Sequence, residues 1–317
     1  MATAVDYLRL LVPQRRAAWS IGIYAGPSPF ALTPHPAVGY QPVLAAHSLG
    51  AIAADGVADP FMVRNGADWL MFFEVENRLS GRGEIGLASS SDAFSWRFED
   101  IVLKEPFHLS YPHVWEFDGR WYMMPEAAAS GGVRLYVADS FPFRWKLVRE
   151  IIRGDLADAT PFRHDGRWWI MALEGFRKRD ALVIYFADRL EGPWQPHFAN
   201  PVIERNSRIT RPAGRMISIE GSLIRFTQDC EGSYGRLVRA FRVDGLTPHR
   251  YAEQSLGGRE VIGASGKGWN ATGMHHVDAH ELGPGQWIAC VDGRRTALRL
   301  PLQDRLAVRI MRRHAVA

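Results

Sequence analysis

The sequence predicts an all-β protein, a single five-bladed β-propeller whose ring is closed by an N-terminal strand. Two observations predict this fold: a tryptophan-ended phrase recurs at a fixed spacing, and short apolar runs joined by tight polar turns fill the 317 residues. Repeats of roughly 50 residues, each supplying about four strands, are typical of propeller blades. A β-sandwich, or a pair of sandwiches, is the alternative fold that stays open.

The recurring phrase is an apolar strand followed by a polar turn and a closing tryptophan. It reads LASSSDAFSW at 87–96, LYVADSFPFRW at 135–145 and IYFADRLEGPW at 184–194, so the tryptophans are 49 residues apart each time. A looser copy, RAFRVDGLTPHRY, ends at Tyr251, 57 residues further on. Equal spacing of one phrase three times indicates repeated structural units rather than chance.

Predicted hairpins interleave with this phrase. Each consists of an apolar strand, a polar turn that often reads D-G-R-W, and a second apolar strand rich in β-branched and aromatic residues, which is the pattern of two strands joined by a tight turn. The copies occupy 59–74, 111–126, 158–174, 213–228 and 276–292. Counting them predicts one domain over 1–317, with blades that start near Val57, Ser110, Ala157, Arg211 and His275.

One apolar strand is left over near the start of the chain. It reads AAWSIGIYAG at 17–26, and we expect it to pair with the last blade, because that pairing removes two exposed sheet edges. Before it, a short helix around Tyr7–Leu11 is the one segment with an apolar period near 3.6 residues.

Composition and charge exclude several classes of protein. With 47% hydrophobic and 23% charged residues the chain is ordinarily globular, and no apolar run approaches the ~20 residues of a transmembrane segment. The net charge is only +4, and the arginines are scattered, so we expect no nucleic-acid partner. Cys230 and Cys290 cannot build a disulfide scaffold or a zinc site, and no export signal precedes them, so we expect a cytoplasmic protein.

Polar residues recur where the paired strands of each hairpin should end. In a blade, the start of the innermost strand and the end of its antiparallel neighbour lie at the same rim of the ring. These rim positions hold Asp59 with Glu74, Tyr111 and His113 with Glu126, Asp158 with Glu174, Arg211 with Gln228 and Asp229, and His275 and His276 with Asp292. Carboxylates gathered in this way raise one another's pKa values, which places a neutral acid beside an ionised base. Such pairs carry glycosidic bond cleavage.

The same residues have structural interpretations. An Asp before a proline, such as Asp59, often caps the backbone of a turn, and Glu174 lies beside a charged run that is typical of a solvated loop. Imidazole and carboxylate groups also suit a metal ion, but histidine pairs are more often part of a hydrogen-bonded framework. We therefore predict no metal and no cofactor, and keep one alternative metal set, His275, His276 and Asp278.

Short phrases at these positions carry a family resemblance. A-D-P-F at 58–61, D-A-T-P-F at 158–162 and E-G-P-W at 191–194 resemble the five-bladed propellers of glycoside hydrolase families 43, 32 and 68. In more detail, the chain resembles the N-terminal propeller domain of glucosamine inositolphosphorylceramide transferases and related bacterial proteins. That likeness extends from about Trp19 to Gly293, and its phrases are H-L-S-Y-P-H-V at 108–114, M-P-E-A at 124–127, R-P-A-G-R at 211–215, Q-D-C at 228–230 and Tyr234-Gly235.

The resemblance to the hydrolases implies three acidic roles. It implies an Asp base or nucleophile opening blade one, which corresponds to Asp59, a second Asp that tunes the acid, and a Glu that acts as the acid. Tyr111 stands where those families place the tuning Asp, and Asp158 appears one blade later. Rim geometry makes Glu126 and Glu74 the candidates for the acid.

We therefore expect a glycosidase-like, carbohydrate-active enzyme that cleaves or transfers a glycosyl unit at the rim end of the central channel. We call this end of the channel the funnel. Its predicted catalytic residues are Asp59, Glu126, Glu74 and Asp158, and its predicted residues for binding a carbohydrate or glycolipid are Tyr111, His113, Arg211, Gln228, Asp229, His275 and His276. The alternative is a non-catalytic sugar- or glycolipid-binding propeller that assists a partner glycosyltransferase. A metal-dependent nucleotide-sugar transferase has the least support, because the sequence holds no Gly-rich phosphate loop and no D-x-D at a strand end.

Overall fold

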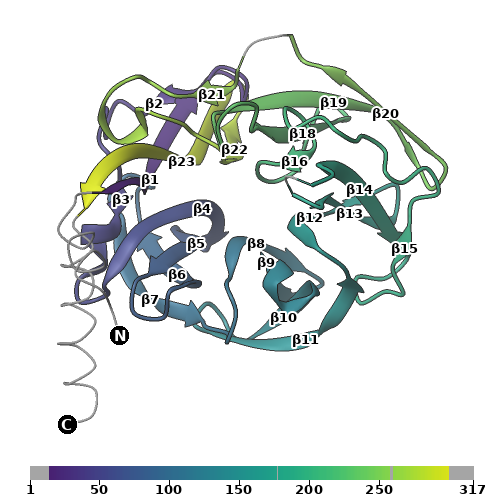
Figure 1. The fold of residues 1–317 in the computed structure, drawn as a ribbon, viewed down its shortest axis with the longest axis horizontal. Coiled ribbons are helices and arrows are strands. Elements are labelled where there is room, and N and C mark those ends of the chain that lie inside the picture. The colour runs from purple at the N-terminus through teal and green to yellow at the C-terminus, as the bar shows by residue number, and fades with distance from the viewer. Residues whose placement is uncertain (1–13, 177, 258–259, 300–317) are drawn as a thin grey trace, which may run out of the picture.

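The computed structural model describes residues 14–176, 178–257 and 260–299. Five antiparallel sheets stand around one central axis, each with its innermost strand toward the centre (Figure 1). The predicted all-β, five-bladed propeller is therefore confirmed. The short helix expected around Tyr7–Leu11 lies outside the described residues. Within the described ranges, no helix is long and apolar enough to cross a membrane.

Four blades are built from strands that follow one another along the chain, from the channel outward. Blade one contains β4 (Ala54–Asn65), β5 (Asp68–Asn77), β6 (Arg82–Ser90) and β7 (Arg97–Leu103), and blade two contains β8 (Ser110–Phe117), β9 (Arg120–Glu126), β10 (Gly132–Ser140) and β11 (Arg144–Arg153). Blade three contains β12 (Leu156–His164), β13 (Arg167–Glu174), β14 (Ala181–Ala187) and β15 (Gln195–Pro196). Blade four contains β16 (Arg211–Pro212), β18 (Ser222–Asp229), β19 (Leu237–Thr247) and β20 (Arg250–Ser255), with β17 (Ile217–Ile219) and β21 (Ile262–Gly263) at its sides. In the described part of the chain, three short 3-10 helices lie in the connections: η1 (Ala46–Leu49), η2 (Ala128–Ser130) and η3 (Gly268–Asn270).

The fifth blade joins the two ends of the described chain. Its inner strands are β22 (Val277–Gly283) and β23 (Gln286–Arg299), and its third strand is β1 (Gln14–Gly26), flanked by β2 (Thr33–Pro34) and β3 (Leu44–Ala45). Strand β1 pairs with β23 along its whole length, from Gln14 opposite Arg299 to Gly26 opposite Trp287. The prediction that the segment 17–26 closes the ring is confirmed, and the pairing covers edges that would otherwise template aggregation.

The recurring tryptophans have a common structural role. Each follows the third strand of its blade and closes the turn into the outer strand by donating its indole N–H to a backbone carbonyl. The acceptors are Ala93 for Trp96 (2.9 Å), Pro142 for Trp145 (2.9 Å) and Leu190 for Trp194 (3.0 Å). Because a buried indole N–H needs a partner, the 49-residue spacing in sequence reports one turn repeated in three blades.

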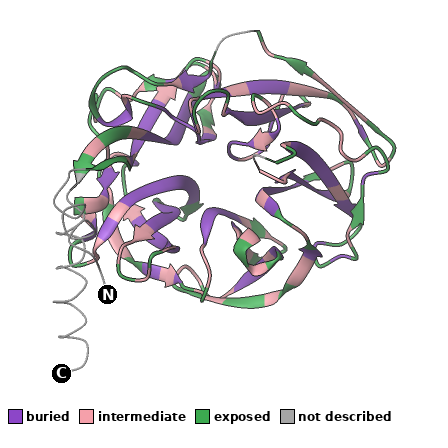
Figure 2. Cartoon of the chain, in the orientation of Figure 1, coloured by how far each residue is buried: buried purple, intermediate pink, exposed green. Residues whose placement is uncertain are grey.

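The hydrophobic core is divided among the five blade interfaces. Each cluster of buried apolar side chains draws from two neighbouring blades; the cluster between blades five and one, for example, joins Ile21 and Ile23 to Met62 and Met71. The other four clusters lie between blades one and two, two and three, three and four, and four and five. Burial accordingly follows the faces of the inner and middle strands, while the outer margin of the ring is exposed (Figure 2).

Arg215 ties four blades together inside the channel. Its side chain, from the loop after β16, pairs with Asp278 of blade five (Nε to Oδ1, 2.8 Å) and reaches His113 of blade two (3.3 Å). It also donates to the backbone carbonyls of Met62 in blade one (3.3 Å) and Val114 in blade two (3.1 Å). The contacted residues come two to three positions after the predicted rim residues of their strands. We call this layer, Arg215 with Asp278 and His113, the floor of the funnel.

Candidate functional site

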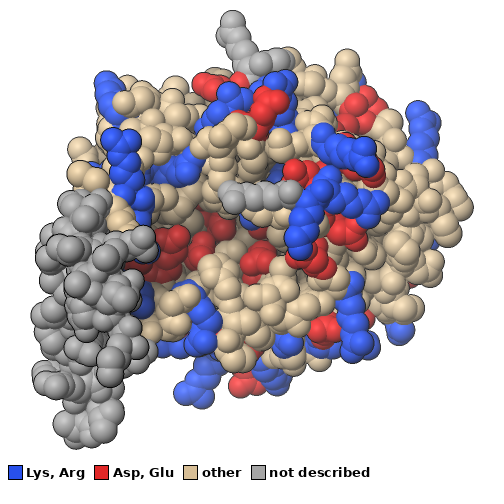
Figure 3. Space-filling model, viewed as in Figure 1, with Lys and Arg blue, Asp and Glu red and all other residues tan. Residues whose placement is uncertain are grey.

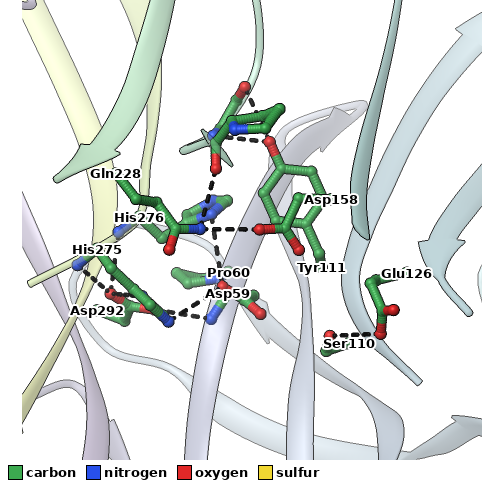
Figure 4. Close-up of polar contacts among 12 residues, drawn as sticks. Asp59, Pro60, Ser110, Tyr111, Glu126, Asp158, Gln228, His275, His276 and Asp292 are labelled. Atoms are coloured by element: carbon green, nitrogen blue, oxygen red, sulfur yellow. Dashed lines mark hydrogen bonds and ion pairs between the residues drawn. The ribbon is translucent and has the colours of Figure 1, made fainter. Parts of the chain in front are cut away.

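Three blades open with the same bulge at the rim. The register shifts where β4 pairs β5, where β8 pairs β9 and where β12 pairs β13. In each bulge one non-glycine residue has a positive φ: Asp59 (51°), Tyr111 (46°) and Asp158 (51°). Left-handed backbone at such residues costs energy and is concentrated where a side chain must be aimed at a site. The bulges bring these three side chains into one group (Figure 4).

Asp59 lies at the centre of the group. It is buried, and within the described ranges its Oδ1 has no hydrogen-bond partner. The Nε2 of His275 and the Nδ1 of His276 each lie 3.8 Å from that oxygen. Burial, together with the carboxylates of Asp292 and Asp158, raises the pKa of Asp59 well above its ordinary value, although the His275 ring opposes this.

Asp292, on β23, holds His275 in place. Its carboxylate contacts the Nδ1 of His275 at 2.7–2.8 Å and accepts the backbone N–H of Asp59 (3.0 Å). Burial alone would lower the pKa of His275, but the adjacent Asp292 and Asp59 carboxylates raise it above its ordinary value. The pKa values of His275 and Asp59 are thus both raised, and the charge of each group affects the protonation of the other.

Asp158 is occupied by partners from blade four. Arg211 contacts both of its carboxylate oxygens (Nε to Oδ2, 2.5 Å; Nη2 to Oδ1, 3.3 Å), and the Gln228 amide donates to Oδ2 at 2.8 Å. The Arg211 guanidinium in turn lies over the rings of Phe176 and Tyr234. The structure thus brings Asp158, Arg211 and Gln228 together, but the Arg211 cation compensates the charge of the Asp158 carboxylate.

Glu126 and Glu74 lie at the rim as their register predicted. Glu126 accepts the backbone N–H of Ala128 (2.8 Å) and the hydroxyl of Ser110 (3.3 Å), apart from the Asp59 group (Figure 4). Burial, reinforced by the Asp158 charge, raises the pKa of Glu126. Glu74 is buried and contacts the Nε2 of His108 at 3.1 Å.

The structure places two other predicted binding residues, Tyr111 and His113, in buried supporting positions and turns a third, Asp229, away from the site. Tyr111 is fully buried, and its hydroxyl bonds to Thr160 (2.8 Å) and to the backbone of Gly214 (2.8 Å and 3.1 Å). His113 stacks on Phe61 in the floor, where burial lowers its pKa well below the ordinary value. Asp229 points away, into an ion pair with two arginines of blade four, Arg236 (2.9 Å) and Arg239 (2.7 Å).

His276 is the least partnered group of the site. Its ring is fully buried, and neither ring nitrogen has a hydrogen bond among the described residues. Burial lowers the pKa of His276 to about 4. The ring is held instead by edge-to-face contacts with Phe61 (4.6 Å) and Tyr111 (5.3 Å).

The alternative metal set is not assembled as three free ligands. Both carboxylate oxygens of Asp278 are taken, by Arg215 and by His280 with the Met62 amide. Asp59, His275 and Asp292 do place ligand-type atoms within 4.8 Å of one another. However, Asp292 already accepts hydrogen bonds from His275 and the backbone, so this trio is arranged as a hydrogen-bonded network.

The face of the molecule above this group is hollowed at its centre. Figure 3 shows Asp and Glu side chains gathered in the hollow and Lys and Arg side chains around it. An acidic hollow bounded by basic groups suits a polyhydroxylated ligand, because hydroxyls donate to carboxylates.

The sequence did not predict a role for Asp292 or for the two aromatic rings that contact His275. Trp19, on β1, stacks on the His275 ring with 4.1 Å between centroids, and Tyr234 meets its edge at 5.2 Å. The signal for Asp292 was its register, which matches that of Glu74 and Glu126. Trp19 comes from the other end of the chain and had no such signal.

Comparison with known proteins extends this description. Residues 12–294 match the family described as "Glucosamine inositolphosphorylceramide transferase 1, N-terminal". A protein of that name, glucosamine inositolphosphorylceramide transferase 1, from Oryza sativa subsp. japonica is 36% identical over 304 residues, which cover 90% of this chain and 41% of that protein. Its namesake from Arabidopsis thaliana is 34% identical over 298 residues, 88% of this chain and 39% of that protein. The chain spans about two fifths of the length of these relatives.

Solved structures share the fold. A thermostable family-43 glycoside hydrolase aligns with a TM-score of 0.54 and 14% identity, covering 71% of this chain and 81% of that chain. At this identity the likeness shows the propeller architecture alone. The resemblance read from the short phrases is confirmed by the sequence matches, and the chain belongs to the family of the N-terminal domain of glucosamine inositolphosphorylceramide transferase 1.

Proposed function

We propose that this chain binds a glycosyl unit or glycolipid headgroup in the funnel and cleaves or transfers it by carboxylate acid–base chemistry, with Asp59 as base or nucleophile. The observation that carries the proposal is the environment of Asp59. Its carboxyl is buried on a strained bulge, with one oxygen that lacks a partner in the described part of the chain. An unpaired buried carboxyl is costly, and such groups are kept where chemistry needs them.

Glu126 is the acid in this proposal. It has no ion pair among the described residues, and burial raises its pKa, so it retains a proton closer to neutral pH than an exposed Glu. Protonation of a leaving oxygen by one carboxyl while another assists at the anomeric carbon is the shared logic of glycoside cleavage. Glu74 is the second candidate for this role, although its contact with His108 leaves it more strongly paired.

The name of the relatives suggests which ligands to test first. It contains glucosamine and inositolphosphorylceramide, so amino sugars and inositol phosphate glycolipids head the set of compounds. Arg211 would face such a ligand only after releasing Asp158, since its guanidinium is already paired.

A second function is favoured by the pairing of Asp158. Because Arg211 and Gln228 occupy this carboxylate, one of the four predicted catalytic acids is not free to act. A funnel in which this acid is held in an ion pair would bind sugar without cleaving it. The chain would then be a sugar- or glycolipid-binding propeller that assists a partner glycosyltransferase. Because the chain covers only 41% of the rice relative, the remaining part of that relative is the first candidate for such a partner. A cytoplasmic location stays a prediction from the sequence.

The test measures binding and turnover separately. Wild type, Asp59→Asn and Glu126→Gln are screened against immobilised glycans, inositol phosphate glycolipids and activated glycosides. Asp188→Asn is the matched control, because this acid is exposed on the outer surface. We expect turnover by wild type and by the control, a loss of at least 100-fold in Asp59→Asn and Glu126→Gln, and unchanged binding in all four proteins.

Other outcomes decide between the two functions. Binding by wild type without turnover of any compound would reject the enzyme and support the binding propeller. Equal turnover by wild type and Asp59→Asn would reject Asp59 as the reacting group. Absence of both binding and turnover across the whole set would reject both functions.

A further inference from the structure

Asp292, on β23 of blade five, connects that blade to blade one. Its buried carboxylate accepts the backbone N–H groups of Asp59 (3.0 Å), His275 (3.1 Å) and His276 (3.1 Å) as well as contacting the His275 ring. Burial alone would raise the pKa of Asp292, but the His275 ring and these donors lower it below the ordinary value. A carboxylate with this many donors is ionised and fixed in position.

The His275 ring has one orientation available. Asp292 holds its Nδ1 side, the Trp19 ring covers one face at 4.1 Å and 20°, and Tyr234 stands at its edge. His275 is only 2% exposed, so its ring cannot turn without displacing these groups. In this orientation its Nε2 faces Oδ1 of Asp59 at 3.8 Å. This distance is longer than a hydrogen bond, as is common between reacting groups before a substrate binds.

His276 provides an internal comparison. Its Nδ1 lies at the same 3.8 Å from Asp59 Oδ1, but Asp292 contacts its backbone and not its ring. Burial then dominates and lowers the pKa of His276 to about 4, whereas that of His275 is raised. Of the two rings beside Asp59, Asp292 holds only that of His275, so the positive charge is favoured on His275 and not on His276.

We propose that Asp292 and His275 form a positioning pair that sets the charge of Asp59, with one proton held jointly by His275 and Asp59. When the proton is on His275, Asp59 is a carboxylate that can act as a base; when it moves to Asp59, the ring is neutral. This inference rests on the proposed function for its catalytic meaning.

The charged and titratable groups around His275 come from every element packed on it. They are Asp59 on β4, Asp292 on β23, Arg211 on β16, Tyr234 in the turn after β18, and the adjacent His276. Arg211 opposes the charge on His275, but its own partner Asp158 largely neutralises it. Asp292 and Asp59 therefore dominate.

The test follows the protonation of Asp59 directly and requires no substrate. The full chain is labelled with [13Cγ]aspartate and 15N-histidine, the Asp59 signal is assigned from its loss in Asp59→Asn, and both nuclei are followed against pH by NMR. His275→Asn is the main variant, because Asn places an amide near the Nδ1 position and can still bond to Asp292. His276→Asn is the matched control at equal distance.

We expect the Asp59 and His275 signals of wild type to titrate in shared steps. His275→Asn should weaken the acid dissociation of Asp59 about tenfold or more, because it removes the nearest cation. His276→Asn should change that constant less than about twofold, since its ring is neutral. Asp292→Asn should lower the pKa of His275, because it removes the carboxylate that holds the Nδ1 side of the ring.

Two results would overturn the proposal: an Asp59 titration that is unchanged in His275→Asn, or an equal shift in His276→Asn. Should Asp292→Asn fail to fold, the two histidine variants still decide. The titration is also independent of turnover, so failure of the proposed enzyme leaves this result standing, and failure here leaves the enzyme standing. Where turnover is found, His275→Asn should move the acid limb of its pH profile upward by about one unit.

Discussion

Neighbouring residues of one type behave in opposite ways in this protein. His275 and His276 are adjacent, both are buried, and both face the same carboxyl oxygen. The difference is one contact: Asp292 holds the ring of His275, and no hydrogen bond reaches the ring of His276 among the described residues. Electrostatic surroundings, rather than residue type, decide which histidine carries a charge.

This difference predicts how His276 affects stability in acid. Its folded pKa, about 4, is lower than its ordinary value of 6.5, so below pH 6.5 the unfolded chain takes up a proton that the folded protein does not. We expect His276 to lower the free energy of unfolding by about 3 kcal/mol as pH falls from 6.5 to 4. Urea unfolding of wild type and His276→Asn at several pH values measures this.

His275 is the control of opposite sign. Its folded pKa is raised, so its contribution to stability is fully present below the unfolded value and is lost as pH rises through the folded value. His275→Asn should therefore lose stability mainly on the acid side. Parallel curves for wild type and His276→Asn across this pH range would contradict the prediction.

At the scale of elements, ring closure depends on two positions without side chains on the paired strands β1 and β23. The indole of Trp269, in η3, packs across Gly22 and Gly293 of these paired strands. A Cβ on Gly22 would lie 2.6 Å from the indole, and a Cβ on Gly293 would lie 2.6 Å from it on the neighbouring strand. The two glycines therefore serve packing, since neither has a left-handed backbone.

Gly22→Ala should accordingly weaken the closure. The added methyl must displace Trp269 from the core between blades four and five, and overpacking of this kind costs about 1–3 kcal/mol. Gly283→Ala in β22 of the same blade is the matched control, because its Cβ would meet nothing within 4 Å. Denaturant unfolding gives the cost, and hydrogen exchange should be faster in β1 and β23 of Gly22→Ala alone. Equal stability of the two variants would show that Trp269 does not depend on Gly22.

At the scale of the whole molecule, interactions across the channel hold the blades in one arrangement. The apolar clusters join only neighbouring blades, whereas Arg215 reaches from blade four to blades one, two and five. Asp278, its partner, is fully buried, and although burial would raise its pKa, the Arg215 and His280 charges lower it far below the ordinary value. The pair therefore links blades that share no apolar cluster.

Arg215→Met should destabilise the whole propeller. It leaves Asp278 as a buried charge with only His280 and the Met62 amide beside it among the described residues, and breaking such a pair costs about 3–5 kcal/mol. The double variant Arg215→Met/Asp278→Asn should recover part of this loss, because the uncompensated charge is gone. A double-mutant cycle from urea unfolding measures the coupling, and strictly additive single losses would contradict it.

Much of the propeller could be predicted because its evidence is local in the sequence. Hairpins, the turn closed by Trp96, Trp145 and Trp194, and the strand that closes the ring follow from periods of two residues and from repeats of about 50. Strand register also predicted that Asp59 lies beside Glu74 and that Glu126 lies at the start of β8: Ala58 pairs with Glu74, and Ser110 pairs with Glu126. These relations need only the neighbouring strand.

The sequence by itself thus determined the blades, the closing strand and the residues that stand at the rim. Only the tertiary structure decided which of them meet. Asp158 is paired by Arg211 from another blade, Asp229 turns to arginines of its own blade, and Asp292 organises a site that Trp19 completes from the opposite end of the chain. The physical reason is that contacts across a ring depend on the twist of each blade and on the φ of single bulge residues. A repeat pattern carries neither quantity, since it describes each blade alone.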